Sequence, residues 1–221
     1  MPPTDRFVIS FAAEPPQEPL PYGRWADTLR EHFLAACREI DTEGEDIGQP
    51  GEVAWFPDRT YAGRTYIPAV ARTSTGHELF GFVSFADRGG NGGPGEFEAR
   101  VDFTTELAEA NPDWKLDLND DVVGVWRGEQ GRTADMTLVW GVPMIPGGAV
   151  VTAELANLAV DQCALVDERF TLLAPDNYRS DYLEVKLWDR RGSELAVESL
   201  YVDDGSGEDD EDDAAETASE S

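Results

Sequence analysis

The chain has few basic residues, and almost none of them are lysines. Its 221 residues include 17 bases, of which only Lys115 and Lys186 are lysines, against 45 acids and a formal net charge of −28. Such a protein repels nucleic-acid phosphate and anionic membranes, and it attracts basic partners and cations. The charge therefore argues against nucleic acid and membrane as partners, and it favours a protein partner, a basic one in particular.

The side chains that most often carry out catalysis are also scarce. There are two histidines, His32 and His77, and two cysteines, Cys37 and Cys163. They form no His-x-x-x-His or Cys-x-x-Cys pair, and there is no Gly-x-Ser-x-Gly motif. We therefore predict no catalytic residue, no cofactor and no metal.

Long apolar runs and signals for export are missing as well. No apolar run approaches the roughly 18 residues that a membrane helix needs, and the first residues lack the charged and apolar regions of a signal peptide. A chain of this size does not need a disulfide between its two cysteines, which favours a reducing compartment. We expect a soluble, cytoplasmic protein.

Acidic residues are concentrated at the C-terminal end. Residues 203–221 hold ten acids and no base, and they offer little apolar surface to offset an ordering entropy of about 1–2 kcal/mol per residue. We predict a disordered acidic tail there. The preceding 202 residues are still acidic, with 35 acids and 17 bases. That acidity fits either adaptation to high salt with an arginine-rich codon bias, or a surface selected for a basic partner, and both interpretations stay open.

The remaining chain divides into a short N-terminal segment and one domain. Residues 1–23 combine a predicted strand at Phe7–Ala12 with a proline-rich linker at Glu14–Pro21, and residues 24–202 are predicted to form a single domain. From Arg24 to Ile40, apolar residues recur at three- and four-residue spacing, which predicts a helix.

Most of the rest has the patterns of strands. In Phe97–Phe103 the apolar residues alternate with Glu98, Arg100 and Asp102, which is typical of a half-buried antiparallel strand. Similar segments predict the other strands, at Val53–Phe56, Tyr66–Arg72, Leu79–Phe85, Val122–Trp126 and Met136–Val142, and a closing hairpin of Tyr182–Trp188 with Glu194–Tyr201.

Two further helices are expected from capping residues and periodicity. A brief one begins at Thr104 or Thr105 and ends at Asn111, and a long one begins at Thr152 and ends before Pro175. The long one is predicted from a stripe of seven residues, namely Leu155, Leu158, Ala159, Cys163, Val166, Phe170 and Leu173. The predicted fold class is therefore α+β, an antiparallel sheet with two or three helices packed on one face.

Three segments carry a resemblance to a known group. They are Asn111-Pro-Asp-Trp-Lys-Leu-Asp-Leu-Asn-Asp-Asp121, Leu138-Val-Trp-Gly-Val-Pro-Met144 and Val151-Thr-Ala-Glu-Leu155. With the predicted order of elements, the chain resembles the type III secretion chaperone-like fold, including its YbjN and TY-Chap relatives. The resemblance implies a small, acidic binding module without catalytic residues, and it leaves a homodimer open.

Two motifs have simpler interpretations than ligand binding. Gly89–Gly95 leads into a strand, whereas a phosphate loop needs a helix N-terminus, so we predict a hairpin connection. The Asp117-x-Asn119-x-Asp121 stretch matches half of a calcium loop, but Val122 and Gly128 stand where glycine and glutamate are required. We predict an Asn-Asp turn there.

The candidate binding residues are tryptophans. Trp126, Trp140 and Trp188 either belong to the core or line an open sheet face suited to a peptide, and we take them as candidate partner-binding residues. The predicted function is a non-enzymatic acidic binding module, a chaperone-like or adaptor protein that engages another protein. Two alternatives remain open: an immunity-type or DNA-mimicking inhibitor of a basic protein, and a carboxylate-dependent enzyme with or without a divalent metal.

Overall fold

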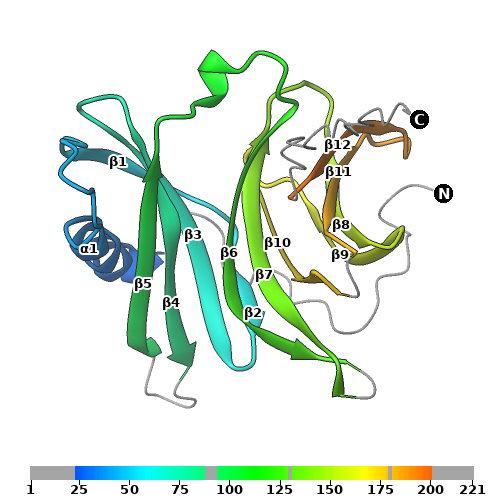
Figure 1. Cartoon of the computed structure of the whole chain (residues 1–221), viewed down its shortest axis with the longest axis horizontal. Helices are drawn as coiled ribbons and strands as arrows, with labels where there is room; N and C mark the ends of the chain where they lie inside the picture. The colour runs from blue at the N-terminus through cyan, green and yellow to red at the C-terminus, as the bar shows by residue number, and fades with distance from the viewer. Residues whose placement is uncertain (1–22, 88–93, 129–130, 179–180, 201–221) are drawn as a thin grey trace, which may run out of the picture.

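Antiparallel strands dominate the computed structural model, which describes residues 23–87, 94–128, 131–178 and 181–200 (Figure 1). Within these residues there are three sheets and one α-helix. The predicted strand Phe7–Ala12, the proline-rich linker, the acidic tail and most of the glycine-rich loop lie outside the described residues. The layers follow one another across Figure 1 as helix, first sheet, second sheet and third sheet.

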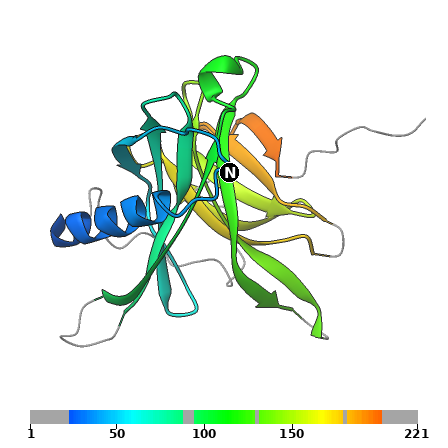
Figure 2. The same ribbon diagram turned by 60° about the vertical axis from the view of Figure 1, so that its left-hand side comes forward.

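Helix α1, Ala26–Cys37, covers one face of the first sheet (Figure 2). Leu29, Phe33 and Cys37 recur every four residues, and all three are buried against Ile67 and other apolar side chains of the sheet. The helix predicted near Arg24 is thus confirmed, with a 3₁₀ turn at Gly23–Trp25 in front of it.

The first sheet has five strands. They are β1 (Pro50–Trp55), β2 (Arg59–Tyr61), β3 (Arg64–Thr73), β4 (Glu78–Asp87) and β5 (Pro94–Thr104), in the order β1-β3-β4-β5 with β2 also pairing with β3. Strand β5 alternates as predicted, because Phe97, Val101 and Phe103 pack into the cluster beneath α1. Its polar residues point to the opposite face.

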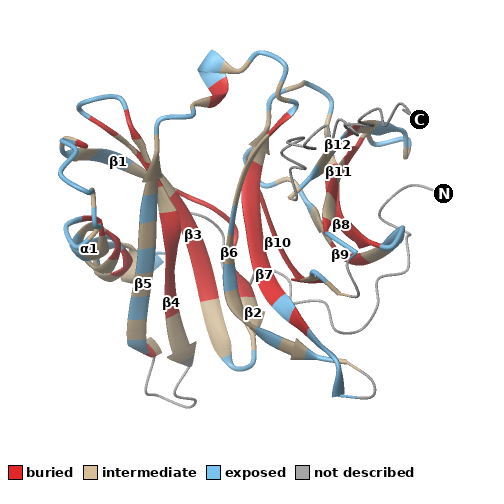
Figure 3. Ribbon diagram, viewed as in Figure 1, coloured by how far each residue is buried: buried red, intermediate tan, exposed pale blue. Residues whose placement is uncertain are grey.

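The second sheet is the middle layer. It consists of β6 (Leu116–Arg127), β7 (Thr133–Pro143) and β10 (Phe170–Asp176), in the order β10-β7-β6. Two of its three strands, all but β6, are buried on both faces over most of their length. Leu138 and Trp140 pack with Phe82 of the first sheet, whereas Val139 and Leu172 pack toward the third. Figure 3 shows the buried residues along β7 and β10. Burial on both faces explains why the central part of β7, Met136–Val142, has only one polar residue, Thr137.

The third sheet closes the stack. Its strands are β8 (Val150–Leu155), β9 (Leu158–Ala164), β11 (Glu184–Trp188) and β12 (Glu194–Ser199), in the order β12-β11-β8-β9. The predicted closing hairpin is confirmed, because β11 pairs antiparallel with β12. No helix in the described part of the chain is long and apolar enough to cross a membrane.

The predicted α+β class is wrong, and the largest error is the long helix at Thr152–Leu173. That stretch forms β8, β9 and the start of β10. Two turns divide it, at Ala156–Asn157 with φ of 51° and 62°, and at Asp167–Glu168 with φ of 49° and 61°. Pairs of positive φ are the hairpin geometry that Asn and Asp tolerate well. The brief helix predicted after Thr104 is only a 3₁₀ turn, Ala108–Ala110.

Candidate functional site

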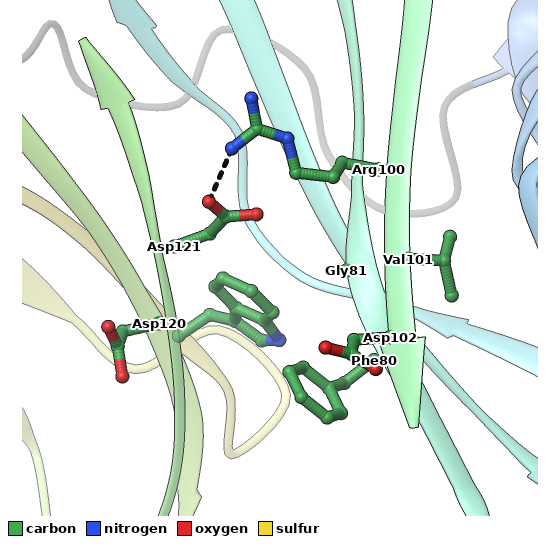
Figure 4. A pocket seen from close by; sticks show the side chains of 8 residues that line it. Phe80, Gly81, Arg100, Val101, Asp102, Asp120 and Asp121 are labelled. Carbon is green, nitrogen blue, oxygen red and sulfur yellow. Dashed lines mark hydrogen bonds and ion pairs between the residues drawn. The ribbon is translucent and has the colours of Figure 1, made fainter. Parts of the chain in front are cut away.

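A pocket of about 340 Å³ lies between the first and second sheets (Figure 4). We call it the inter-sheet groove. Its size is within the range of small-ligand sites, and its lining combines aromatic rings with charged groups. It is lined by residues of β4 and β5 on one side and of β6 and β7 on the other, namely Phe80, Gly81, Arg100, Val101, Asp102, Asp120, Asp121 and Trp140.

The wall from the first sheet is fixed by strand register. Phe80 lies opposite Asp102 and Phe82 opposite Arg100, so these four side chains share the face that is turned away from α1. Gly81 lies between them, and a Cβ there would collide with the carbonyl oxygen of Arg100. The glycine therefore permits the close approach of β5 to β4 beside the groove.

The opposite wall comes from β6. Leu116 and Leu118 pack toward the third sheet, so Asp117, Asn119 and Asp121 alternate onto the face toward the first sheet. The stretch that we predicted as an Asn-Asp turn is therefore part of a strand, because its apolar residues need burial on one side only. No group of three or more potential metal ligands comes together among the described residues.

Arg100 crosses the groove from β5 to β6. Its Nη1 lies 2.7 Å from Oδ1 of Asp121 (Figure 4). The same nitrogen donates to the carbonyl oxygen of Val122 at 3.1 Å. The guanidinium carbon is 5.7 Å from the centroid of the Phe82 ring. The guanidinium of Arg100 thus contacts a carboxylate, a carbonyl oxygen and an aromatic face, while much of the side chain stays exposed.

Carboxylates outnumber guanidinium groups along this face. Arg72 pairs with Glu78 at 3.0 Å and with Glu109 at 2.6 Å, and Arg100 pairs with Asp121. In the described part of the chain, neither Asp102 nor Asp117 forms an ion pair, although Arg72 lowers the pKa of Asp117 from nearby and Asp102 accepts the backbone N–H of Phe103 at 2.8 Å. The face therefore has an excess of negative charge and room for a cation.

The pKa values of several of these carboxyls are raised. Burial is the main cause for the raised pKa of Glu78, Asp117 and Asp121. Neighbouring carboxylates add to it: Asp117 acts on Glu78, Glu109 on Asp117, and Asp102 on Asp121. Each of these groups would gain from a nearby cation, because a cation favours its charged form.

Trp140 supplies a donor without an acceptor. Its side chain is fully buried where it lines the groove, and its Nε1 finds no hydrogen-bond partner among the described residues. An unsatisfied buried donor costs about 1–3 kcal/mol. A ligand oxygen at this position would remove that cost.

The three candidate tryptophans occupy different places. Trp140 lines the groove, whereas Trp126 lies further along β6, edge to face with Tyr178 at a centroid distance of 5.4 Å. Both belong to the apolar cluster between the first two sheets. Trp188 lies in the third sheet, where its Nε1 donates to Oγ1 of Thr152 at 2.9 Å. The structure therefore places two of the three in one apolar cluster, but only Trp140 at the groove.

Sequence reasoning missed Phe80, Arg100, Asp102 and Asp121 as groove residues. The signal that could have pointed to them was the polar face of the segment Phe97–Phe103. That face has the pattern of a solvated surface, and nothing in the sequence says that a second sheet lies opposite to it.

The histidines have partners of a structural kind. His77 bonds Glu45 through Nε2 and Thr75 through Nδ1, both at 2.9 Å. The ring of His32 stacks on Phe97 at a centroid distance of 4.8 Å.

The cysteines are free thiols with suppressed reactivity. Burial raises the pKa of Cys37 and of Cys163 to about 11. Because the thiolate is the reactive form, neither thiol is an activated nucleophile at neutral pH.

No protein-family model matches the chain, and no curated protein or solved structure is significantly similar to it. The resemblance to the chaperone-like group thus stays a prediction from the sequence. Val151–Leu155, which the family pattern places at the start of a last helix, lies in strand β8 here.

Proposed function

We propose that this protein is a non-enzymatic, cytoplasmic binding module, an adaptor or chaperone-like protein that engages a basic segment of another protein in the inter-sheet groove. The proposal involves a protein partner and neither nucleic acid nor membrane. An inhibitor that captures a basic enzyme would be one form of the same function.

The observation that carries the proposal is that two polar groups of the groove, a carboxylate and an indole N–H, have binding capacity that the described residues do not use. Within the described residues, the exposed Asp102 accepts the backbone N–H of Phe103 at 2.8 Å but forms no ion pair, and the buried N–H of Trp140 has no acceptor. A basic peptide segment can bind both groups, because it offers a cationic side chain and backbone carbonyl oxygens. A nucleic acid would offer acceptors, but its phosphates would meet an excess of carboxylates.

Electrostatics supports the same class of partner. Burial raises the pKa of Asp117 and of Asp121, which means that it disfavours their charged forms. A positively charged segment would stabilise these charged forms and reduce the repulsion between neighbouring carboxylates. The net charge of −28 would also attract such a partner from a distance and raise its association rate.

The test compares two doubly substituted chains with equal loss of charge. In the groove variant, Asp117→Asn is combined with Asp121→Asn. In the control, Asp167→Asn is combined with Glu168→Gln in the exposed turn after β9. Proteins captured from the native lysate at low salt are quantified, and the affinity of the strongest basic partner is then measured by calorimetry with purified components.

We expect the groove variant to bind that partner at least tenfold more weakly and the control to bind as the wild type does. Circular dichroism spectra would establish that both variants are folded. Equal affinity of the two variants, or a captured partner with no basic segment, would contradict the proposal.

One observation favours a second candidate function. Carboxyls with raised pKa values in a pocket are what acid–base catalysis uses, and Asp121 lies in such a pocket beside Asp102. Turnover of glycosides or esters by the wild type, abolished by Asp121→Asn in a folded chain, would establish an enzyme instead.

A further inference from the structure

Arg100 shows how the groove holds a guanidinium group. The group has a carboxylate at 2.7 Å, a carbonyl oxygen at 3.1 Å and the Phe82 ring at 5.7 Å. The ring belongs to β4, the arginine to β5 and both oxygens to β6. This arrangement depends on the pairing of Phe82 with Arg100 across two neighbouring strands.

The same strands repeat part of this arrangement two residues further along. Phe80 lies opposite Asp102 (Figure 4), and the strand register puts both on the same face as Phe82 and Arg100. This second position has an aromatic ring and a carboxylate. The Asp102 carboxylate accepts the backbone N–H of Phe103 at 2.8 Å, but among the described residues it forms no ion pair. Trp140, with its unpaired Nε1, lines the same pocket from the second sheet.

Resting on the proposed function, we infer that this second position binds an arginine side chain of the partner. The guanidinium group bonds the Asp102 carboxylate and lies against the Phe80 ring. A carbonyl oxygen of the same peptide segment accepts the hydrogen bond from Nε1 of Trp140. Arg100 stays on Asp121, so the bound state has two guanidinium groups side by side on two carboxylates.

Arginine fits this position better than lysine does. A guanidinium is planar and donates in a fork that matches a carboxylate, and it also stacks on an aromatic face. An ammonium group is a compact and strongly hydrated charge, so it would gain less from the Phe80 ring. A bare metal ion would need more ligands than the described residues bring together.

The test is an NMR titration that follows the indole N–H resonance of Trp140 among the six tryptophans. That resonance is assigned by its loss in Trp140→Phe, or by triple-resonance experiments if this variant does not fold. The probes are blocked pentapeptides, Gly-Ala-Arg-Ala-Gly and its versions with lysine or citrulline at the centre. Citrulline keeps the shape of arginine without its charge.

We expect the arginine peptide to shift the Trp140 resonance downfield in a saturable way and to bind at least fivefold more tightly than the lysine peptide. The citrulline peptide should cause no shift at the same concentration. Asp102→Asn should weaken binding of the arginine peptide at least tenfold, whereas the matched control Asp167→Asn should not change it.

Equal binding of the arginine and lysine peptides, or a wild-type affinity in Asp102→Asn, would overturn the arginine site. The proposed function would survive that result if the natural basic partner still distinguished Asp117→Asn/Asp121→Asn from its control. Conversely, a saturable shift with arginine peptides and no basic partner in the cell would leave the arginine site standing and overturn the proposed function.

Discussion

Two arginine–aspartate pairs join different layers of the molecule, and they differ in almost every physical respect. Arg59 and Asp161 lie 3.4 Å apart with side chains only 2% and 4% exposed. Arg100 and Asp121 lie 2.7 Å apart with side chains 62% and 23% exposed. The same two residue types therefore form an inaccessible pair in one place and an accessible pair in the other.

The surroundings of the two pairs differ as much as their exposure. The Asp161 carboxylate also accepts the backbone N–H groups of Gln162 and Leu173, both at 2.8 Å. Asp121 shares its groove with Asp102 and with the unpaired N–H of Trp140. The buried pair therefore belongs to the fold, whereas the accessible pair borders a groove that a ligand can reach.

The largest expected effect comes from breaking the buried pair. Arg59→Met should lower the free energy of unfolding by about 3–5 kcal/mol, because it leaves the carboxylate of Asp161 buried without its base. Urea unfolding followed by fluorescence measures this. A loss below about 1 kcal/mol would mean that water or other groups compensate the carboxylate, and the contrast with the accessible pair would disappear.

The next largest effect is expected from salt, which should slow binding at the accessible groove but leave the stabilising effect of the buried pair unchanged. Binding of a basic partner should lose at least tenfold in association rate between 0.1 M and 1 M salt, as the Debye length falls from about 10 Å to about 3 Å. The buried pair is shielded from ions, so salt should not selectively remove its contribution to stability. Stopped-flow measurements across this range give the rate, and a rate independent of salt would remove electrostatic steering from the account.

The carboxyl groups along the groove should make the folded protein more stable at lower pH. Glu78, Asp117 and Asp121 have raised pKa values, so the folded chain binds more protons than the unfolded chain between the ordinary values of 3.8 to 4.5 and the raised ones. The free energy of unfolding contributed by these groups is therefore highest below that window and falls as the pH rises through it.

We accordingly expect the melting temperature to rise as the pH is lowered from neutrality toward the ordinary carboxyl values of 3.8 to 4.5. The rise should be smaller in Asp117→Asn/Asp121→Asn, because these amides do not titrate. Scanning calorimetry at several pH values tests this. An equal rise in the double variant would place the responsible carboxyls elsewhere.

The smallest expected effect is on stability when the accessible pair is broken. Arg100→Ala should change the free energy of unfolding by less than about 1 kcal/mol, because exposed ion pairs contribute little. The same urea titration measures it beside Arg59→Met. A loss comparable to that of Arg59→Met would show that Arg100 holds the sheets together instead of bordering a binding site.

The elements that bury only one face could be predicted from the sequence, because their apolar residues recur at a regular spacing. Helix α1 repeats its buried residues every four positions, and β5 alternates every two. In β8 every residue is buried, so the strand lacks the alternation of apolar and polar residues that would identify it. Its last residue, Leu155, therefore matches the helical spacing of the apolar residues that follow, which predicts a helix. The turns that interrupt this stretch depend on single residues such as Asn157.

The groove could not be predicted in the same way. Arg100 and Asp121 are 21 positions apart, and they meet only because the first and second sheets stack with their polar edge strands facing each other. Trp140 was identified as a candidate from its residue type, but its missing acceptor is a property of packing. Sheet stacking is a tertiary property that strand periodicity does not encode.

The most direct test of the central claim is to map where a captured basic partner protects the chain from amide hydrogen exchange. Binding in the groove predicts protection in β4 around Phe80, in β5 around Arg100–Asp102 and in β6 around Asp117–Asp121, with the third sheet and α1 unchanged. Protection confined to β8, β9, β11 and β12, or to α1, would contradict the groove as the binding site.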